Sequence, residues 1–414
     1  MQHVFSEVST AIPTINGTEA ATWSGLIMVL SHFSFRLFSV LLSSIPFTLS
    51  STAGTAAETE LAFNTLQEWY SNDTGLWTTA GWWNSANCLT TVGDLAAVDS
   101  SVAPTVQKVF SNTLVQAQKA NLQMQKVVTA SFNVETFYGP VFPSNVVVPE
   151  STNTKGFLNG FYDDEGWWAL GWIQAYDVTK NTEYLQTAMD IFNDMSGGGN
   201  TPCGGIWWDK AQTYVNAIAN ELYLSVAAHL ANRLPNDQSN YLNIALKQWN
   251  WFENTGMINS KNTINDGLTK SCEPNNGTVW SYNQGVILGG LVELATASGD
   301  PSYLLTASTI ASAAISALSN SSGVLHDPCE PNCGGDGSQF KGIFMRNLGK
   351  LQTVRPKDEF LGFIESNKDS ILKSNRDSKN RMGVVWSGPV TEPATASSHS
   401  SAMDALVAAL ALGV

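Results

Sequence analysis

Residues 160–168, with the sequence Gly-Phe-Tyr-Asp-Asp-Glu-Gly-Trp-Trp, set three consecutive acidic side chains among four aromatic rings. The chain continues as an apolar segment in which Trp168, Trp172 and Tyr176 recur at every fourth position, so that they share one face of a helix. This pattern predicts that Asp163 and Asp164 lie in the loop and first turn that lead into a buried helix. The helix dipole favours negative charge at that end.

A pair of adjacent carboxyl groups can perform two different chemical tasks. One group stays ionised and acts as a nucleophile or a stabiliser, while burial and its neighbour's charge keep the other protonated as a general acid. Two carboxyl groups about 5 Å apart are typical of retaining glycosidases, and aromatic rings pack well on the C–H faces of a pyranose. The alternative is a solvated helix terminus with Asp163 as its N-cap, which would not need four flanking rings.

The run 162–173, YDDEGWWALGWI, resembles the signature of glycoside hydrolase family 76, the endo-α-1,6-mannanases. That family includes fungal cell-wall proteins associated with the mannose core of GPI anchors. The resemblance covers most of the chain from Ala57 onward and implies an (α/α)6 barrel. It also implies that Asp163 is a nucleophile that forms a covalent mannosyl-enzyme and that Asp164 is the acid/base, with no metal or coenzyme.

Three other functions remain open on the sequence alone. The same covalent intermediate could be transferred to wall glucan instead of water, which would make the protein a transglycosidase acting on the GPI-anchor mannose core. The chain could also be a glycan-binding wall protein with an inactive site. Finally, it could be an inverting hydrolase or a lyase on the same barrel, in which case the carboxyl groups of a hydrolase would lie about 6.5–9.5 Å apart.

The spacing of motifs independently predicts the fold. A unit of about fifty residues repeats, in which a loop rich in Gly, Trp and Asp precedes an apolar helix, a turn and an amphipathic helix. Such helical hairpins bury their apolar faces only by stacking, and a ring of six leaves no exposed end. We therefore expect an all-α, (α/α)6 barrel of about twelve helices, with the Trp-bearing loops at one rim. The expected helices include 57–70 (with Leu61, Leu66 and Trp69 inward), 89–98, 104–130, 183–195, 236–254, 301–318, 358–372 and 401–412.

The N-terminal segment predicts export. Residues 26–49 form the most hydrophobic run, but His32, Arg36 and Pro46 interrupt it, which is unfavourable for a membrane-spanning helix. Arg36, the apolar stretch after it and small residues at 51–53 fit a signal peptide. We expect an extension with a signal peptide over 1–53 and one barrel domain over 54–414, secreted to the wall or medium as a monomer without stable membrane insertion. An uncleaved signal anchor is the alternative.

Amino-acid composition limits the classes of partner that the protein is expected to bind. Charged residues make up only 14% of the 414 residues, and the net charge of −14 argues against nucleic acid and anionic membranes. It favours neutral or cationic partners; a neutral glycan fits, and the family resemblance implies that this glycan is mannan. Five cysteines predict one or two disulfides and a leftover thiol in an oxidising compartment, with Cys329 and Cys333 as a loop staple rather than a metal site. A Ser/His/Asp triad through His399, in the Ser-rich stretch 388–400, has no nucleophile-elbow motif.

Candidate substrate-binding residues lie in the loops before the apolar helices. Aromatic residues there could stack on sugars, and carboxylates and amides could bind hydroxyl groups; the alternatives are packed Trp pairs, a capping Asp209, and Asn216 paired with Asn220. Glu221, the one acid of its apolar helix, is either a buried paired group or part of the acid network. The candidates are Trp82, Trp83, Tyr162, Trp167, Trp207, Trp208, Asp209, Asn216, Tyr282, Asn283, Gln284, Asp336 and Lys341.

Overall fold

The computed structural model describes residues 45–121, 125–128, 134–137, 156–390 and 392–414, with side chains from residue 52 onward outside the strands 125–128 and 134–137. The chain divides at Ile45 and Pro46, and everything below concerns the unit Pro46–Val414. Most of the predicted signal peptide therefore lies outside the described residues. Within them, no helix combines the length and the apolar character needed to cross a membrane.

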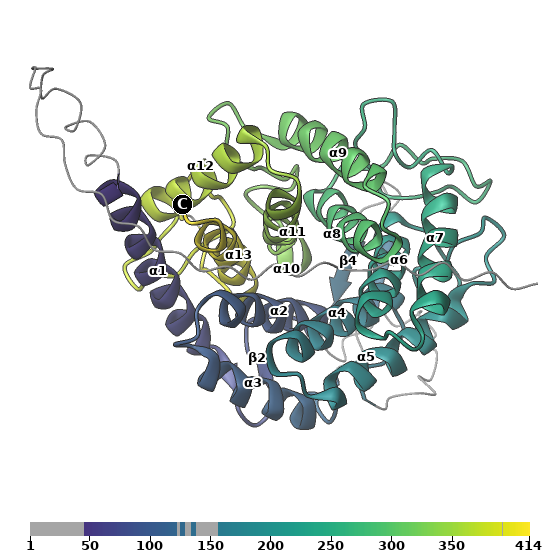
Figure 1. Ribbon diagram of the computed structural model, residues 1–414, viewed down its shortest axis with the longest axis horizontal. Coiled ribbons are helices and arrows are strands. Elements are labelled where there is room, and N and C mark those ends of the chain that lie inside the picture. The colour runs from purple at the N-terminus through teal and green to yellow at the C-terminus, as the bar shows by residue number, and fades with distance from the viewer. Residues whose placement is uncertain (1–44, 122–124, 129–133, 138–155, 391) are drawn as a thin grey trace, which may run out of the picture. The chain divides into compact units, whose positions relative to one another are not determined.

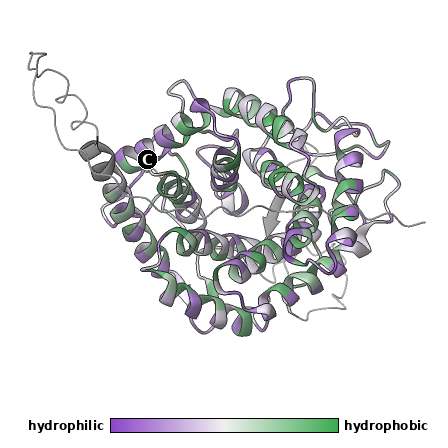
Figure 2. Cartoon of the chain, viewed as in Figure 1, coloured by the Kyte–Doolittle hydropathy of each residue, from purple (hydrophilic) through white to green (hydrophobic). Residues whose placement is uncertain are grey.

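Six inner helices form a closed ring, as Figure 1 shows. Each contacts the next, and the last contacts the first. They are buried on nearly every side, because both the neighbouring inner helices and an outer layer cover them, and Figure 2 shows apolar residues along them. The inner helices are α2 (Trp82–Val98), α4 (Tyr162–Thr179), α6 (Ala217–Arg233), α8 (Ser281–Ser298), α11 (Phe340–Val354) and α13 (Ala396–Leu412).

Six outer helices surround this ring and are amphipathic. In α5, for example, Leu185, Ala188 and Ile191 are buried while the opposite face is polar, and Asn181 caps the helix by accepting a hydrogen bond from the backbone N–H of Glu183 (3.0 Å). The (α/α)6 barrel expected from the repeating motif is therefore confirmed. The outer helices are α1 (Ile45–Gln67), α3 (Ala103–Gln116), α5 (Thr182–Met195), α7 (Gln238–Glu253), α9 (Ser302–Leu318) and α12 (Asp358–Ser374).

The sixth helical pair combines the two ends of this unit. Thr52 and Thr55 of α1 donate hydrogen bonds to the backbone carbonyls of Gly413 and Val414, both at 3.1 Å. The contact of α13 with α2 completes the inner ring, so the first described helix acts as the outer partner of the last. Two short antiparallel hairpins, β1 (Tyr70–Ser71) with β2 (Leu76–Trp77) and β3 (Gln125–Val128) with β4 (Val134–Phe137), complete the strands of the described residues.

Several predicted boundaries are wrong. Helix α2 begins at Trp82 rather than at residue 89, because the Trp pair is buried within its first turn. The helix expected over 104–130 ends at Gln116, and part of that range is strand β3. Helix α13 begins at Ala396, so His399 lies inside a helix, fully buried. Leu61, expected inward, is 39% exposed.

The inner helices run parallel, since each alternates with an antiparallel outer helix, and their N-terminal ends gather at one rim. Backbone hydrogen bonds tie the loops there: Tyr162 donates to Trp208 (2.9 Å), and Ala217 donates to Asp266 (2.8 Å). The Cys203–Cys272 disulfide joins two of the same loops. The second disulfide links Cys329 and Cys333, and Cys88 is a buried thiol, as the cysteine count led us to expect. Short helices η1 (Ser196–Gly198) and α10 (Gly334–Gly337) also occur, and α10 contacts β4.

Candidate active site

Asp163 and Asp164 are the second and third residues of α4 and lie at this rim. Phe161, not Asp163, occupies the N-cap position, so Asp163 belongs to the first turn. Asp163 is 7% exposed and Asp164 has no exposed surface, so neither carboxyl group lies in bulk solvent. The simple alternative of a solvated helix cap therefore does not describe this pair.

The carboxyl group of Asp164 is held by an amide. Asn159 donates from Nδ2 to Asp164 Oδ2 at 2.7 Å, and its backbone N–H donates to Glu165 Oε1 at 3.0 Å. Lys210 in turn forms ion pairs with Glu165 (2.7 Å) and Asp194 (2.6 Å). Burial alone would lower the pKa of Lys210, but these two carboxylates outweigh it and raise the pKa. The third acid of the motif is thus a structural anchor.

Other carboxyl groups surround Asp163. Burial raises the pKa of Asp209, and the negative charge of Asp163 adds to that rise, while hydrogen bonds from Thr213 oppose it. Burial also raises the pKa of Asp266 to about 7, again with a contribution from Asp163, although the Tyr214 hydroxyl donates to Asp266 at 2.7 Å. An anion near each of these groups disfavours its ionised form. The site is therefore an acidic cluster that contains more than the sequence motif.

Asp266 was missed by the sequence analysis. It lies in a loop, with no aromatic pair beside it in the sequence, and its backbone bond from Ala217 and the hydrogen bond from Tyr214 hold it near Asp163. The one available signal was the Asn265-Asp266-Gly267 tripeptide, which by itself indicates a turn. Its carboxyl group is placed by tertiary contacts that the sequence does not reveal.

Two further buried polar groups lie on neighbouring inner helices. Neither carboxyl oxygen of Glu221 and neither side-chain polar atom of Asn283 has a hydrogen-bond partner among the described residues, and both side chains are fully buried. Burial raises the pKa of Glu221 well above its usual range, and Asp266 adds to the rise. Burying such groups without a partner is unfavourable by about 1–3 kcal/mol each, which singles both out from the surrounding core.

A continuous set of aromatic rings connects four inner helices at the rim. Trp83 stacks on Trp167 with ring centroids 5.6 Å apart, and its indole N–H donates to Asp336 Oδ1 at 2.7 Å. Phe340 lies 6.3 Å from Trp83 and stacks closely on Tyr282, at 3.8 Å. Burial raises the pKa of Tyr282 well above its usual range, with Asp266 and Asp163 as further causes. Four of the predicted residues, Trp83, Trp167, Tyr282 and Asp336, are thus brought together near the acids.

The other predicted aromatic residues have different settings. Trp82 packs in the core against Phe157 and Trp168, and Trp208 is likewise buried. Tyr162 is buried under the ammonium of Lys210, which lies 5.5 Å from its ring centroid. Trp207 is half-buried and donates its indole N–H to Asn200 at 2.9 Å. Trp280, the half-buried N-cap of α8, was not among the candidates.

Several predicted polar ligands are occupied by the protein itself. Asp209 accepts hydrogen bonds from the backbone N–H (2.8 Å) and hydroxyl (2.6 Å) of Thr213. Asn216 caps α6 through a bond from Ala219 N–H at 3.2 Å. Gln284 forms two bonds with the backbone of Ile264, at 2.9 and 3.0 Å. These side chains position the loops of the rim.

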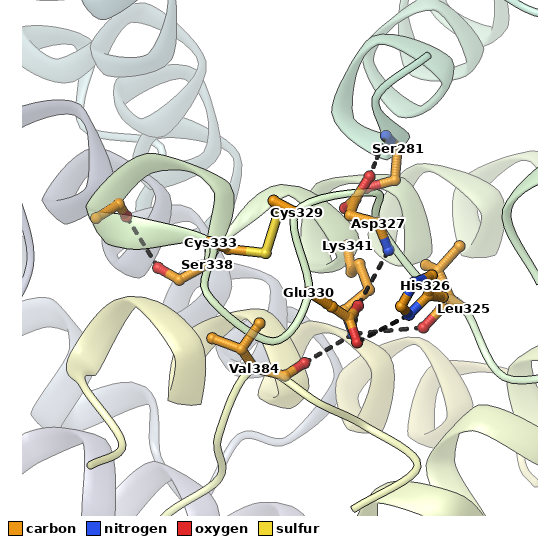
Figure 3. Close-up of a disulfide and its surroundings, with 11 residues drawn as sticks. Ser281, Leu325, His326, Asp327, Cys329, Glu330, Cys333, Ser338, Lys341 and Val384 are labelled. Carbon is orange, nitrogen blue, oxygen red and sulfur yellow. Dashed lines mark hydrogen bonds and ion pairs between the residues drawn. A yellow bond between two sulfur atoms is a disulfide. The ribbon is translucent and has the colours of Figure 1, made fainter. Parts of the chain in front are cut away.

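Lys341 is also engaged, as Figure 3 shows. Its ammonium forms an ion pair with Glu330 (2.6 Å) and donates to the carbonyl of Val384 (2.7 Å), and it lies 4.5 Å from the ring centroid of Trp386. The side chain is 2% exposed. Lys341 joins the loop that contains the Cys329–Cys333 disulfide to α11. Because its ammonium hydrogens are engaged in these contacts, Lys341 is not part of the proposed substrate site.

A cleft away from the acid pair offers less favourable chemistry. A cleft of about 680 Å³ is lined by the C-terminal parts of α4, α6, α8 and α11, at the end opposite the acid pair. Its carboxylates are already neutralised, because Arg233 forms ion pairs with Asp177 and with Glu293, at 2.5 and 2.9 Å. It offers no pair of acids with unlike environments, so the chemistry points to the other rim. No group of three metal-ligating side chains occurs within the described ranges.

The fold and the acid pair place this protein in the class of helical-barrel glycoside hydrolases. The family model of glycosyl hydrolase family 76 matches residues 48–413, and the chain belongs to that family. It is similar to mannan endo-1,6-alpha-mannosidase DFG5 of Candida albicans, with 27% identity over 51% of each chain. It is also similar to DFG5 of Saccharomyces cerevisiae, with 24% identity over 56% of this chain and 53% of that one. The chain spans about half the length of these yeast relatives.

Solved structures share the fold. An inactive variant of the alpha-1,6-mannanase GH76A of Salegentibacter, in which two adjacent aspartates are replaced by asparagine and alpha-1,6-mannotriose is bound, has a TM-score of 0.71 at 19% identity. It covers 87% of this chain and 100% of that one. Dfg5 from Chaetomium thermophilum, in complex with glucosamine, has a TM-score of 0.67 at 18% identity and covers 90% and 92% of the two chains.

Proposed function

We propose that this protein is a retaining glycosidase that hydrolyses α-1,6-mannosidic bonds in mannan. The observation that carries the proposal is the pair Asp163 and Asp164 in the first turn of α4, shielded from bulk water and placed in unlike surroundings. The names of the yeast relatives and the mannotriose bound by the bacterial structure support α-1,6-mannan as the substrate class. That mannanase is inactive when two adjacent aspartates are replaced, which supports Asp163 and Asp164 as the catalytic groups of this protein.

The proposed reaction has two displacements. In the first, Asp163 attacks the anomeric carbon and forms an ester bond to it, while the glycosidic C–O bond breaks and Asp164 gives its proton to the departing oxygen. In the second, Asp164 takes a proton from water, the water oxygen bonds to the anomeric carbon, and the ester bond to Asp163 breaks. Burial of both carboxyl groups excludes competing water from these steps.

The half-buried rings in the loops of the rim, Trp207 and Trp280, are the proposed contacts for the sugar faces. The set Trp83, Trp167, Phe340 and Tyr282 forms an aromatic wall, and Phe340 packs against Trp280 with ring centroids 5.6 Å apart. Asp336 is held against Trp83 and extends this wall toward the disulfide loop. A rigid aromatic frame reduces the conformational entropy that the protein loses when the substrate binds.

A second candidate is a transglycosidase, in which a glucan hydroxyl replaces water in the second displacement. The similarity to Dfg5, whose solved structure holds glucosamine, favours keeping it as a candidate for this chain. Product analysis with and without an oligosaccharide acceptor separates the two, because only transfer gives a product longer than the donor.

We also propose that the protein is exported as a monomer. Two disulfides, which form and persist in oxidising compartments, support export. The acceptor asparagines of two sequons, Asn72 and Asn276, are exposed, as glycosylation would require. Secretion in a fungal host, followed by enzymatic deglycosylation and mass measurement, tests this; a full-length, unglycosylated intracellular product would contradict it.

The catalytic assignment is tested by two isosteric substitutions. Asp163→Asn and Asp164→Asn should each reduce turnover of linear α-1,6-mannan by a factor on the order of 10³ or more, while circular dichroism and the unfolding midpoint stay near those of the wild type. The replacements preserve shape and remove the ionisable group. Mannan turnover that persists in both variants would refute the assignment.

A further inference from the structure

We propose that Asn159 is a positioning residue for Asp164 and that its side-chain amide determines which oxygen of that carboxyl group carries the catalytic proton. The inference rests on the proposed function, because it assigns Asp164 the acid/base role. It adds Asn159, which lies three positions before Tyr162 and is not part of the run 162–173 that resembles the family signature.

The orientation of the Asn159 amide follows from its two partners. Its Oδ1 accepts a hydrogen bond from the backbone N–H of Phe161 at 2.8 Å, which forms a turn directly before α4. Its Nδ2 must then face Asp164, to whose Oδ2 it donates at 2.7 Å. A flipped amide would place oxygen against the carboxyl oxygen and nitrogen against an N–H, so that both bonds would be lost.

The position of Asn159 is fixed on the backbone side as well. Its own N–H donates to Glu165 Oε1 at 3.0 Å, and Glu165 is held by Lys210 at 2.7 Å. Lys210 is joined to this turn again, since its backbone N–H donates to Gly160 at 2.9 Å. Asn159 is 3% exposed. The amide is therefore a rigid donor and not a mobile surface group.

This geometry has a chemical consequence for proton transfer. Oδ2 of Asp164 accepts a short N–H bond, so a proton on the carboxyl group resides on Oδ1, and Oδ1 is the oxygen that donates. As the glycosidic bond breaks, the Oδ1–H bond breaks too, its proton goes to the leaving oxygen, and negative charge develops on Asp164. The amide N–H stabilises that charge as it forms, which lowers the barrier. In the second displacement Oδ1 takes the proton back from water.

The test is a change of leaving group. Asn159→Asp retains the oxygen that accepts from Phe161 and removes the donor to Asp164. The ratio kcat/KM, which reports the first displacement, is measured with α-1,6-mannotetraose and with 2,4-dinitrophenyl α-1,6-mannobioside, whose leaving group departs without protonation. We expect a loss of about 10²-fold on the tetraose and a value near that of the wild type on the aryl glycoside. An equal loss on both substrates would overturn the proposal.

Three comparisons isolate the effect. Asn375 is a buried amide of the same kind outside the site, with bonds to the carbonyl (2.8 Å) and N–H (3.0 Å) of Gly383, so Asn375→Ala should leave the ratio between the two substrates unchanged. Asp164→Asn should reproduce the leaving-group pattern of Asn159→Asp in stronger form. Asn159→Ser, which can keep the turn, serves if the Asp variant does not fold. Cleavage of both substrates by the wild type tests the proposed function itself and is read separately.

Discussion

Buried carboxyl groups set the electrostatics of the site at the scale of single residues. Glu221 and Asp266 are almost completely inaccessible to solvent, and within the described part of the chain the partner that Asp266 finds is a neutral hydroxyl. Burial raises the pKa of both groups, that of Asp266 to about 7. Below about pH 7 the folded protein therefore holds a proton on Asp266 that the unfolded chain has released.

This difference makes stability depend on pH. For a carboxyl group with a raised pKa, the stabilisation is complete below the unfolded pKa of about 4 and is lost as the pH rises through the folded value. The free energy of unfolding should fall between pH 6.5 and 8.5, and Asp266→Asn should make that fall shallower by up to about 1 kcal/mol per pH unit, because an amide does not titrate. His229 and His399, whose burial lowers their pKa to about 4, act mainly below this window.

Urea unfolding at the two pH values measures the effect. Glu365, on the exposed face of α12, provides the matched control, and Glu365→Gln should keep the slope of the wild type. If Asp266→Asn also kept that slope, Asp266 would be ionised in the folded protein at both pH values and the electrostatic description of the site would be wrong.

The proposed catalytic pair stands out in the sequence, but the residues that surround and hold it do not. Asp163 and Asp164 stand out because their neighbours in the chain are aromatic. Asn159 and Asp266 act through turns and backbone bridges, which local composition does not reveal. Lys341 resembled a ligand-binding cation, yet its ammonium group is already bound by Glu330 and by backbone carbonyl groups.

At the scale of elements, the barrel requires its neighbouring inner helices to approach one another closely. Gly285 of α8 faces α11 so tightly that a Cβ atom there would lie 2.6 Å from the Cα of Phe344. Gly342 of α11 faces α13 in the same way, with the Cα of Ser401 at 2.5 Å. Since these neighbours are backbone atoms, they can give way only if helices move apart.

This packing predicts opposite effects for two identical substitutions. Gly285→Ala should destabilise the protein by about 1–3 kcal/mol through overpacking. Gly362→Ala, in α12, where a Cβ would meet nothing within 4 Å, should stabilise it by about 0.5–1 kcal/mol through the better helix propensity of alanine. Chemical denaturation of both variants measures the difference, and a neutral or stabilising Gly285→Ala would show that α8 and α11 are not tightly packed.

The number and order of helices could be predicted from sequence, and their limits could not. Periodicity predicted alternating apolar and amphipathic helices, and the ring confirms it. The Trp82-Trp83 pair resembled a loop platform, but a buried first turn accommodates both rings. The Ser-rich start of α13 resembled a loop as well, although small side chains there are required where Ser401 meets Gly342.

At the scale of the whole barrel, closure of the ring of inner helices determines where the acidic cluster lies. The described chain joins its two ends through α1 and α13, so the six inner helices present their N-terminal ends at one rim. Loops from separate repeats meet there, and backbone bonds between them bring Asp209 and Asp266 toward Asp163. A pair of carboxyl groups from one short motif thus acquires an environment built from most of the ring.

The configuration of the first product tests this account most directly. Wild-type protein incubated with linear α-1,6-mannan, and followed by proton NMR from the first minutes, should release reducing ends in the α configuration, because two displacements restore the starting geometry. The β anomer appears only later, by mutarotation. Initial release of the β anomer would contradict a covalent intermediate on Asp163, and with it the division of labour between the two adjacent acids.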